Sequence, residues 1–279
     1  MDLGELKVTT YSVAHAVATI TLSRPERMNA WTGRMHTEYR SLLARAADDL
    51  SVRAIVVTGE GRSFCVGADS KALEGHVERG SYDSGLGDNP AMPGYGVRPE
   101  FDADFAYHFG IPKPIIAAIN GPAAGVGLVL ACYCDLRFAA AGVKLTTSHG
   151  RLGLPAEYGL SWLLPRLIGL SRAADILLSN RIVLSEEAEA LGLVNRVTAP
   201  EDLMDATYAY ARALAADIAP SSLAATKQQL YGDLLHGDVA SAVHDAADRL
   251  AAMMKGPDFA EGVAALTEKR PPNFPDPIP

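Results

Sequence analysis

The sequence predicts an α/β fold, and three features of its residue pattern support this prediction. Short apolar runs bounded by turn residues alternate with helical stretches as far as about residue 198. Residues 199–279 follow a helical pattern throughout. The chain has 279 residues, of which 48% are hydrophobic, so it can bury a sizeable core. We therefore expect an α/β core over residues 1–198 and a helical region over residues 199–279.

The elements of the first half follow from the spacing of their apolar residues. Alternation of apolar and threonine residues predicts two short strands within residues 6–22. Thr32 can cap a helix that runs to about Leu50, because apolar side chains recur there at helical spacing. Further on we expect a strand at 53–58, an irregular segment at 75–100, a helix at 101–110, a strand at 115–119, a helix at 126–134 and a strand at 143–147.

From residue 171 onward the pattern is mainly helical. Ser171 and Ser185 are suitable N-caps, and Glu186 and Glu187 suit the first turn of a helix. A last short strand is expected at 194–197. Amphipathic spacing then predicts helices at 201–218, 221–235, 238–254 and 258–269.

Charge and cysteine usage exclude several classes of protein. The formal net charge is −8, from 33 acidic and 25 basic residues. Binding to phosphate backbones requires a basic surface, so this balance argues against a nucleic-acid partner. The three cysteines form no CxxC motif, and their odd number argues against a disulfide framework. A reducing, cytoplasmic location is the natural expectation.

We also expect no membrane segment and no metal site. The first five residues lack the basic and apolar regions of a signal peptide. Residues 115–133 are apolar and long enough to span a membrane, but Asn120-Gly121-Pro122 would break a helix there. This segment is better described as a buried strand, a sharp turn and a buried helix. The histidines show no metal-ligand spacing.

Two glycine-containing turns are the main candidates for chemistry. Residues 63–69 read Ser-Phe-Cys-Val-Gly-Ala-Asp and follow a predicted strand. Residues 120–127 read Asn-Gly-Pro-Ala-Ala-Gly-Val-Gly and lead from a strand into a helix, whose first N–H groups have no internal partner. Two such donors aimed at one point would form an oxyanion hole.

These two turns, in this order and at this spacing, resemble those of the crotonase (enoyl-CoA hydratase/isomerase) family. The resemblance covers nearly the whole chain. It begins at residues 22–30, Leu-Ser-Arg-Pro-Glu-Arg-Met-Asn-Ala, and it continues through residues 67–69, 113–121, 184–188, 191–197 and 261–270.

The resemblance implies a spiral of ββα units with a helical C-terminal region that forms trimers or dimers of trimers. It implies a lyase or isomerase of fatty acid metabolism acting on an acyl-CoA thioester, with coenzyme A entering only as part of the substrate. The N–H groups of Ala68 and Val126 match the family's oxyanion hole. An enolate held by fixed backbone donors makes physical sense, because such donors need no reorganisation.

Coenzyme A contacts are also implied by the resemblance. Ala68, Asp69, Ser70 and Lys71 match the loop that lines the pantetheine and adenine end of the ligand. Arg27 stands where the family often has a basic residue near the phosphates. Leu266 and Lys269 match C-terminal residues that reach the coenzyme A of a neighbouring subunit.

The sequence departs from the family pattern at the acid/base pair. Typical hydratases use two glutamates, and the matching positions here are Val129 and His149. The remaining groups for proton transfer are the imidazole of His149, a residue type that commonly acts as a general base or acid, and the carboxyl of Glu157. Glu157 matches the second carboxylate of the dienoyl-CoA isomerase branch and could orient the imidazole.

Several reactions therefore remain open. Hydration, double-bond isomerisation, hydrolysis and C–C cleavage are all compatible with the motifs. A β-diketone hydrolase branch of the family, which needs no coenzyme A, also has a histidine at the position of His149, with an aspartate one residue beyond the position of Glu157. The loss of both glutamates also fits a catalytically silent acyl-CoA-binding protein.

Overall fold

The computed structural model describes residues 5–71, 74–75, 99–235 and 237–275. Most of the irregular segment expected at 75–100 lies outside the described residues.

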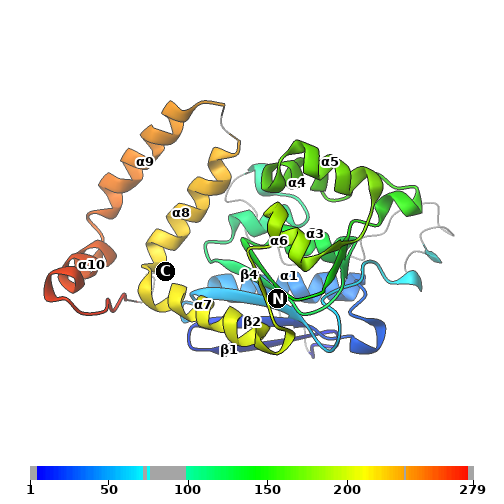
Figure 1. Ribbon diagram of the computed structural model, residues 1–279. Coiled ribbons are helices and arrows are strands. Elements are labelled where there is room, and N and C mark those ends of the chain that lie inside the picture. The colour runs from blue at the N-terminus through cyan, green and yellow to red at the C-terminus, as the bar shows by residue number, and fades with distance from the viewer. Residues whose placement is uncertain (1–4, 72–73, 76–98, 236, 276–279) are drawn as a thin grey trace.

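A six-stranded sheet forms the centre of the α/β fold (Figure 1). The first two strands are antiparallel, and each later strand pairs parallel to its neighbour. In sheet order the strands are β1 (Thr9–Ala14), β2 (Val17–Leu22), β3 (Ala54–Gly59), β4 (Ile115–Ile119), β6 (Leu136–Ala140) and β9 (Arg196–Thr198). Every residue of β3 and β4 is buried, which explains why these two strands read as continuous apolar runs.

Three further strands form a small second sheet, in the order β5 (Ala123–Ala124), β7 (Lys144–Thr146) and β8 (Val183–Leu184). The turn that follows β4 leads from the central sheet into this second sheet, in which β5 pairs parallel to β7. It therefore connects the turn that precedes the apolar helix with the segment that leads to His149.

Helices cover the sheets and form a C-terminal arm. Thr32 caps the first helix as expected, because its hydroxyl accepts a hydrogen bond from the N–H of Met35 at 3.2 Å. The helices are α1 (Gly33–Asp48), α3 (Val126–Tyr133), α4 (Leu160–Ile168), α5 (Leu170–Ser179), α6 (Ser185–Leu191), α7 (Leu203–Asp217), α8 (Pro220–Asp233), α9 (Val239–Met253) and α10 (Pro257–Glu268). No helix in the described part of the chain is long and apolar enough to cross a membrane.

Several predicted elements were wrong or missing. The helix expected at 101–110 is instead two 3₁₀ turns, Pro99–Phe101 and Ala106–Gly110, separated at Phe105 by a left-handed φ of +63°. The prediction missed β6 and α4 entirely. Pro165 lies inside α4 and disguises its helical pattern. The two serines do not act as N-caps: Gly169 precedes α5, so Ser171 lies inside that helix, and Leu184 is the N-cap of α6.

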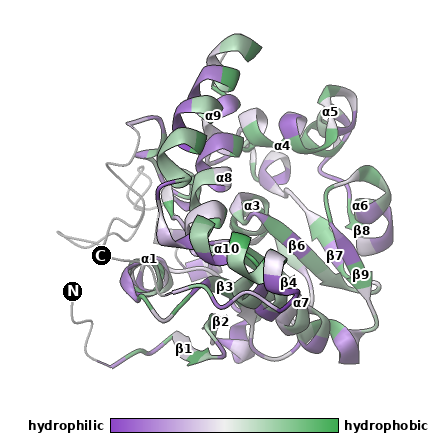
Figure 2. Ribbon diagram, turned by 90° about the vertical axis from the view of Figure 1, so that its left-hand side faces the viewer, coloured by the Kyte–Doolittle hydropathy of each residue, from purple (hydrophilic) through white to green (hydrophobic). Residues whose placement is uncertain are grey.

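The C-terminal arm consists of α8, α9 and α10, and it extends away from the central sheet (Figure 1). No residue of α9 is buried, and Figure 2 shows hydrophobic and hydrophilic residues side by side along this helix. Large apolar side chains on the arm are exposed, among them Leu230, Val239, Val243, Leu250 and Leu266. Arms of this kind commonly pack against another molecule.

A buried histidine, His108, lies within a cluster of aromatic side chains. The hydroxyl of Tyr39 lies 2.8 Å from Nε2 of His108, and Nδ1 of His108 lies 2.6 Å from the carbonyl oxygen of Phe105. The carbonyl can only accept, so Nδ1 carries the proton and Nε2 accepts from the tyrosine. Burial lowers the pKa of His108 to about 3 and that of neighbouring His36 to about 4.

These two histidines predict a loss of stability in mild acid. Below pH ~6.5 the unfolded chain takes up protons at His108 and His36 that the folded chain does not bind. The free energy of unfolding therefore decreases as the pH is lowered. Each group contributes up to about 1.4 kcal/mol per pH unit in that window. Urea unfolding of the wild type and of His108→Gln at neutral pH and near pH 5 measures this. The variant should show a shallower pH dependence, and equal dependences would contradict the account.

Candidate functional site

The first glycine turn exposes the N–H group of Ala68. The turn after β3 forms a parallel bridge with Trp31, in which the N–H of Trp31 donates to Gly67 at 2.7 Å and the N–H of Asp69 donates to Trp31 at 2.9 Å. In such a bridge the residue between these two bonding groups turns its own N–H to the opposite side. Ala68 is that residue; it is exposed, and its N–H donates no backbone hydrogen bond within the described residues.

The second turn presents the first N–H group of α3. Gly125 is the N-cap, with a φ of +51°, and its own N–H donates to the carbonyl of Thr146 at 3.0 Å. Val126 is the first helical residue, so its N–H has no partner inside the helix. Within the described residues no other group accepts from it. The helix dipole adds positive potential at the same place.

The two turns lie directly against each other. Cys65 bridges Ala123 in parallel, which places the strand segments before the two turns side by side. A Cβ added at Gly127 would lie 2.1 Å from the carbonyl oxygen of Cys65, and one added at Gly125 would lie 3.7 Å from Cα of Gly67. At position 127 only glycine allows this approach, whereas the contact at position 125 is an ordinary van der Waals contact. The N–H groups of Ala68 and Val126 therefore belong to adjoining turns, an arrangement that suits a ligand oxyanion.

The structure places Val129 in the core and His149 just after β7, the strand that pairs with β5 of the second turn. Val129 lies one turn into α3 and is 2% exposed, so this position supplies no proton-transfer group. His149 is 8% exposed and begins a 3₁₀ turn, His149–Leu152. The residue before it, Ser148, has a left-handed φ of +60°. Non-glycine residues in this conformation are uncommon and often lie at functional sites.

Glu157 lies near His149 on the following loop. Burial raises the pKa of the half-buried Glu157 carboxyl, and the charge of His149 partly opposes this rise in pKa. The two groups are thus close enough to interact electrostatically. The described residues show no direct hydrogen bond between these two side chains, and such bonds in enzymes often shorten only when substrate binds.

Asn180 holds the backbone next to His149, and the sequence analysis missed it. Its Oδ1 accepts from the N–H of Gly150 at 2.6 Å, and its Nδ2 donates to Leu177 at 2.7 Å. A Cβ at Gly150 would lie 2.8 Å from Nδ2 of Asn180. The only local signal was an asparagine after a helical stretch, which is a common left-handed helix end.

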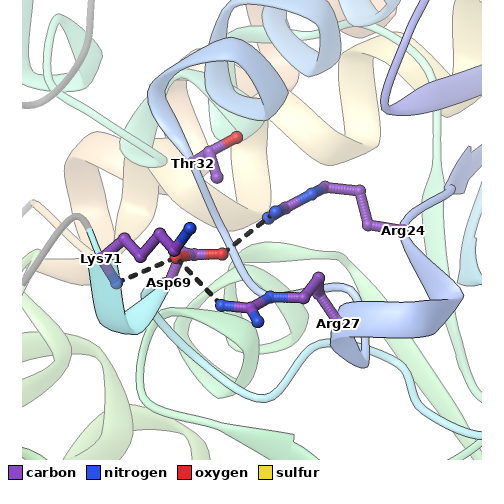
Figure 3. A pocket seen from close by; sticks show the side chains of 5 residues that line it. All are labelled: Arg24, Arg27, Thr32, Asp69 and Lys71. Carbon is purple, nitrogen blue, oxygen red and sulfur yellow. Dashed lines mark hydrogen bonds and ion pairs between the residues drawn. The ribbon is translucent and has the colours of Figure 1, made fainter.

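A basic pocket of about 490 Å³ lies beside the Ala68 turn (Figure 3). It is lined by Arg24, Arg27, Thr32, Asp69 and Lys71. Oδ2 of Asp69 lies 3.0 Å from Arg24, and Oδ1 lies 3.7 Å from Arg27. Although burial favours the neutral acid, the N–H of Lys71 and the Arg24 guanidinium hold the pKa of Asp69 below its usual value. Three cationic side chains and one carboxylate line the pocket, so it suits an anionic ligand.

The remaining predicted contacts are dispersed. Ser70 is exposed beside the basic pocket. Leu266, which is 80% exposed, lies on α10 of the arm, and Lys269 caps that helix with a left-handed φ of +56°. No hydrogen bond or ion pair among the described residues joins these two to the basic pocket. Nor do the described residues contain a cluster of three or more histidine, cysteine or acidic side chains that could hold a metal ion.

Comparisons of the sequence and of the fold with known proteins agree with one another. A model of the enoyl-CoA hydratase/isomerase family matches residues 12–277. The probable enoyl-CoA hydratase EchA12 of Mycobacterium tuberculosis is 40% identical over 269 residues, covering 93% of this chain and 90% of that protein. The 1,2-epoxyphenylacetyl-CoA isomerase of Escherichia coli is 32% identical over 266 residues, covering 94% of this chain and 96% of that protein. A putative enoyl-CoA hydratase from Streptomyces coelicolor A3(2), known by crystal structure, superimposes with a TM-score of 0.83 at 34% identity, covering 98% of this chain and 96% of that chain.

Proposed function

The chain belongs to the enoyl-CoA hydratase/isomerase (crotonase) family, and from this premise we propose that it turns over an acyl-CoA thioester through an enolate. The N–H groups of Ala68 and Val126 bind the thioester oxygen. The observation that carries this proposal is the close approach of the two glycine turns, which brings two backbone donors together. Donors fixed in this way stabilise the charge that develops on the oxygen as the α-proton leaves.

His149 performs the proton transfer in this proposal, with Glu157 as its partner. Neutral imidazole removes the α-proton, the electron pair of the C–H bond forms the double bond between Cα and the carbonyl carbon, and the π electrons of the carbonyl move onto the thioester oxygen. The Glu157 carboxylate stabilises the imidazolium that forms, and the imidazolium then returns the proton to the enolate or to a vinylogous carbon. The buried Val129 supports this assignment, because a valine stands at the position of one of the two hydratase glutamates and transfers no proton.

The basic pocket binds the phosphates of coenzyme A in this proposal. Arg27 and Lys71 supply charge, Ser70 lies beside them, and Asp69 orients the loop through its ion pairs. Leu266 and Lys269 contact the coenzyme A of a neighbouring subunit. The exposed apolar side chains of the arm support an assembly of this kind, a homotrimer or a dimer of trimers built through residues 199–279. A cytoplasmic role in fatty acid metabolism fits such a protein.

Removal of positive charge from the basic pocket is expected to weaken coenzyme A binding. Arg27→Ala and Lys71→Ala should each raise the Kd for free coenzyme A by about 5- to 10-fold, because each loses one charge-assisted contact. The effect should shrink at high salt. Isothermal titration calorimetry measures it, with Arg181→Ala as a control, since Arg181 pairs with Asp175 and Glu187 away from the pocket. Unchanged affinity in both pocket variants would place the phosphates elsewhere.

Two other functions remain as alternatives. The histidine at position 149 fits a β-diketone hydrolase that cleaves a C–C bond without coenzyme A. The valine at position 129 fits a silent acyl-CoA-binding protein. The relatives include both a hydratase and an isomerase by name, so hydration and isomerisation are the first reactions to test.

A turnover screen followed by mass spectrometry distinguishes these functions. The panel contains crotonyl-CoA, a 3-enoyl-CoA, a dienoyl-CoA and a cyclic β-diketone. We expect conversion of at least one acyl-CoA. Conversion of the diketone alone would favour the hydrolase, and coenzyme A binding without conversion of any compound would favour the silent binder.

A further inference from the structure

A hydrogen bond joins the helix of the oxyanion turn to the loop that carries Glu157. The phenol oxygen of Tyr133, the last residue of α3, donates to the carbonyl of Tyr158 at 2.6 Å. Tyr133 is 4% exposed, and burial raises its pKa to about 12, so the phenol keeps its proton at neutral pH. Val126, Val129 and Tyr133 lie along one face of α3. The proposed oxyanion donor, Val126, is at the start of this helix, and Tyr133, which forms the bond to the loop, is at its end.

The loop at this bond has an unusual backbone. Tyr158 has a φ of +50° and Gly159 one of +70°, so two consecutive residues after Glu157 are left-handed. A tyrosine adopts this conformation only when its surroundings hold it there. A Cβ at Gly159 would lie 3.0 Å from the phenol oxygen of Tyr133, so the phenol packs tightly against this turn. The ring of Tyr158 also packs edge-on against Phe105 at 5.0 Å.

We propose that Tyr133 is a positioning residue, whose hydroxyl holds the left-handed turn at Tyr158 and so keeps Glu157 directed toward His149. The inference rests on the proposed pairing of His149 with Glu157. It extends that pairing, because it makes the direction of the Glu157 carboxylate depend on the helix that supplies the Val126 donor. A change at the end of α3 then reaches the proton-transfer pair without touching substrate.

Tyr133→Phe isolates the hydroxyl, because a phenylalanine keeps the ring contacts with Phe105 and Phe109. Tyr231→Phe is a matched control. Tyr231 is a partly buried tyrosine that stacks on Phe109 at 3.9 Å, and its hydroxyl donates to Asp135 at 2.7 Å instead of to the turn. Both variants lose one part-buried hydrogen bond of a tyrosine hydroxyl, and only Tyr133→Phe is expected to loosen the loop of Glu157.

The first measurement needs no substrate. The amide of Leu160 donates to the carbonyl of Glu157 at 3.0 Å, so its hydrogen exchange reports the integrity of the turn. We expect this amide to exchange several-fold faster in Tyr133→Phe than in the wild type or in Tyr231→Phe. Equal exchange in all three proteins would overturn the inference.

The second measurement connects the turn to catalysis. With the acyl-CoA that the screen identifies, Tyr133→Phe should lower kcat by about tenfold and change KM less than twofold. Tyr231→Phe should leave both unchanged. In a Glu157→Gln background the Tyr133 substitution should change kcat less than twofold, whereas a general loss of stability would lower kcat equally in both backgrounds. An additive effect would therefore overturn the inference.

The outcome for Glu157→Gln alone separates the two levels of the proposal. If this variant keeps full activity, the pairing of His149 with Glu157 is wrong. The predicted effect of Tyr133→Phe on kcat is then wrong as well. If it loses activity while Tyr133→Phe keeps it, the pairing stands and only the inference about Tyr133 is overturned.

Discussion

Replacement of His149 by alanine is expected to lower kcat by roughly 10³-fold on the acyl-CoA that the wild type converts. The reason is that position 129 carries a valine, and the proposed base is instead the buried imidazole of His149, just after β7. Without it, water must remove the α-proton. KM should change little, because the backbone donors that bind the thioester oxygen remain.

Steady-state kinetics measures this effect, with His15→Asn as a control. His15 is an exposed histidine in the turn between β1 and β2, and asparagine tolerates its left-handed φ of +51°. His149→Gln should be almost as inactive as the alanine variant, since glutamine keeps much of the volume but transfers no proton. Wild-type kcat in either His149 variant would exclude this histidine as the base.

Gly127→Ala is expected to damage the oxyanion site through packing alone. The added methyl group would lie 2.1 Å from the carbonyl oxygen of Cys65, a distance that no real contact allows. The start of α3 must then move away from the Cys65 turn, which separates the N–H of Val126 from that of Ala68. We expect kcat/KM to fall by roughly 10²- to 10³-fold and the free energy of unfolding to fall by about 1–3 kcal/mol.

Kinetics together with urea unfolding separates the two effects. Gly237→Ala is the matched control, because a Cβ there meets nothing within 4 Å. That variant should keep both activity and stability. A folded Gly127→Ala protein with wild-type kcat/KM would show that the close approach of the two turns is not needed for activity.

Local sequence patterns predicted those parts of the fold that depend on local physics. The apolar runs of β3 and β4 and the capped amphipathic helix α1 need no distant partner to be recognised. By contrast, β6 contains Arg137, which is buried only because its guanidinium donates to carbonyls of Leu193 and Cys134. Tertiary contacts of this kind cannot be read from the segment itself.

The same distinction holds for the candidate site. The glycine turns have a recognisable sequence, so Ala68 and Val126 could be proposed from it. Arg24, Asn180 and Tyr133 could not, because each acts on a partner far along the chain: Arg24 on Asp69, Asn180 on Gly150 and Tyr133 on Tyr158. Residue type and spacing carry no signal for such pairs.

In the proposed reaction, His149 removes the α-proton, and the N–H groups of Ala68 and Val126 hold the enolate that forms. Incubation with butyryl-CoA in D₂O tests it directly, because enolate formation exchanges the α-proton whatever reaction follows. Mass spectrometry should detect deuterium at Cα with the wild type, and uptake should be at least about a hundredfold slower with His149→Ala. Absence of uptake with the wild type, or equal uptake with the variant, would contradict the account.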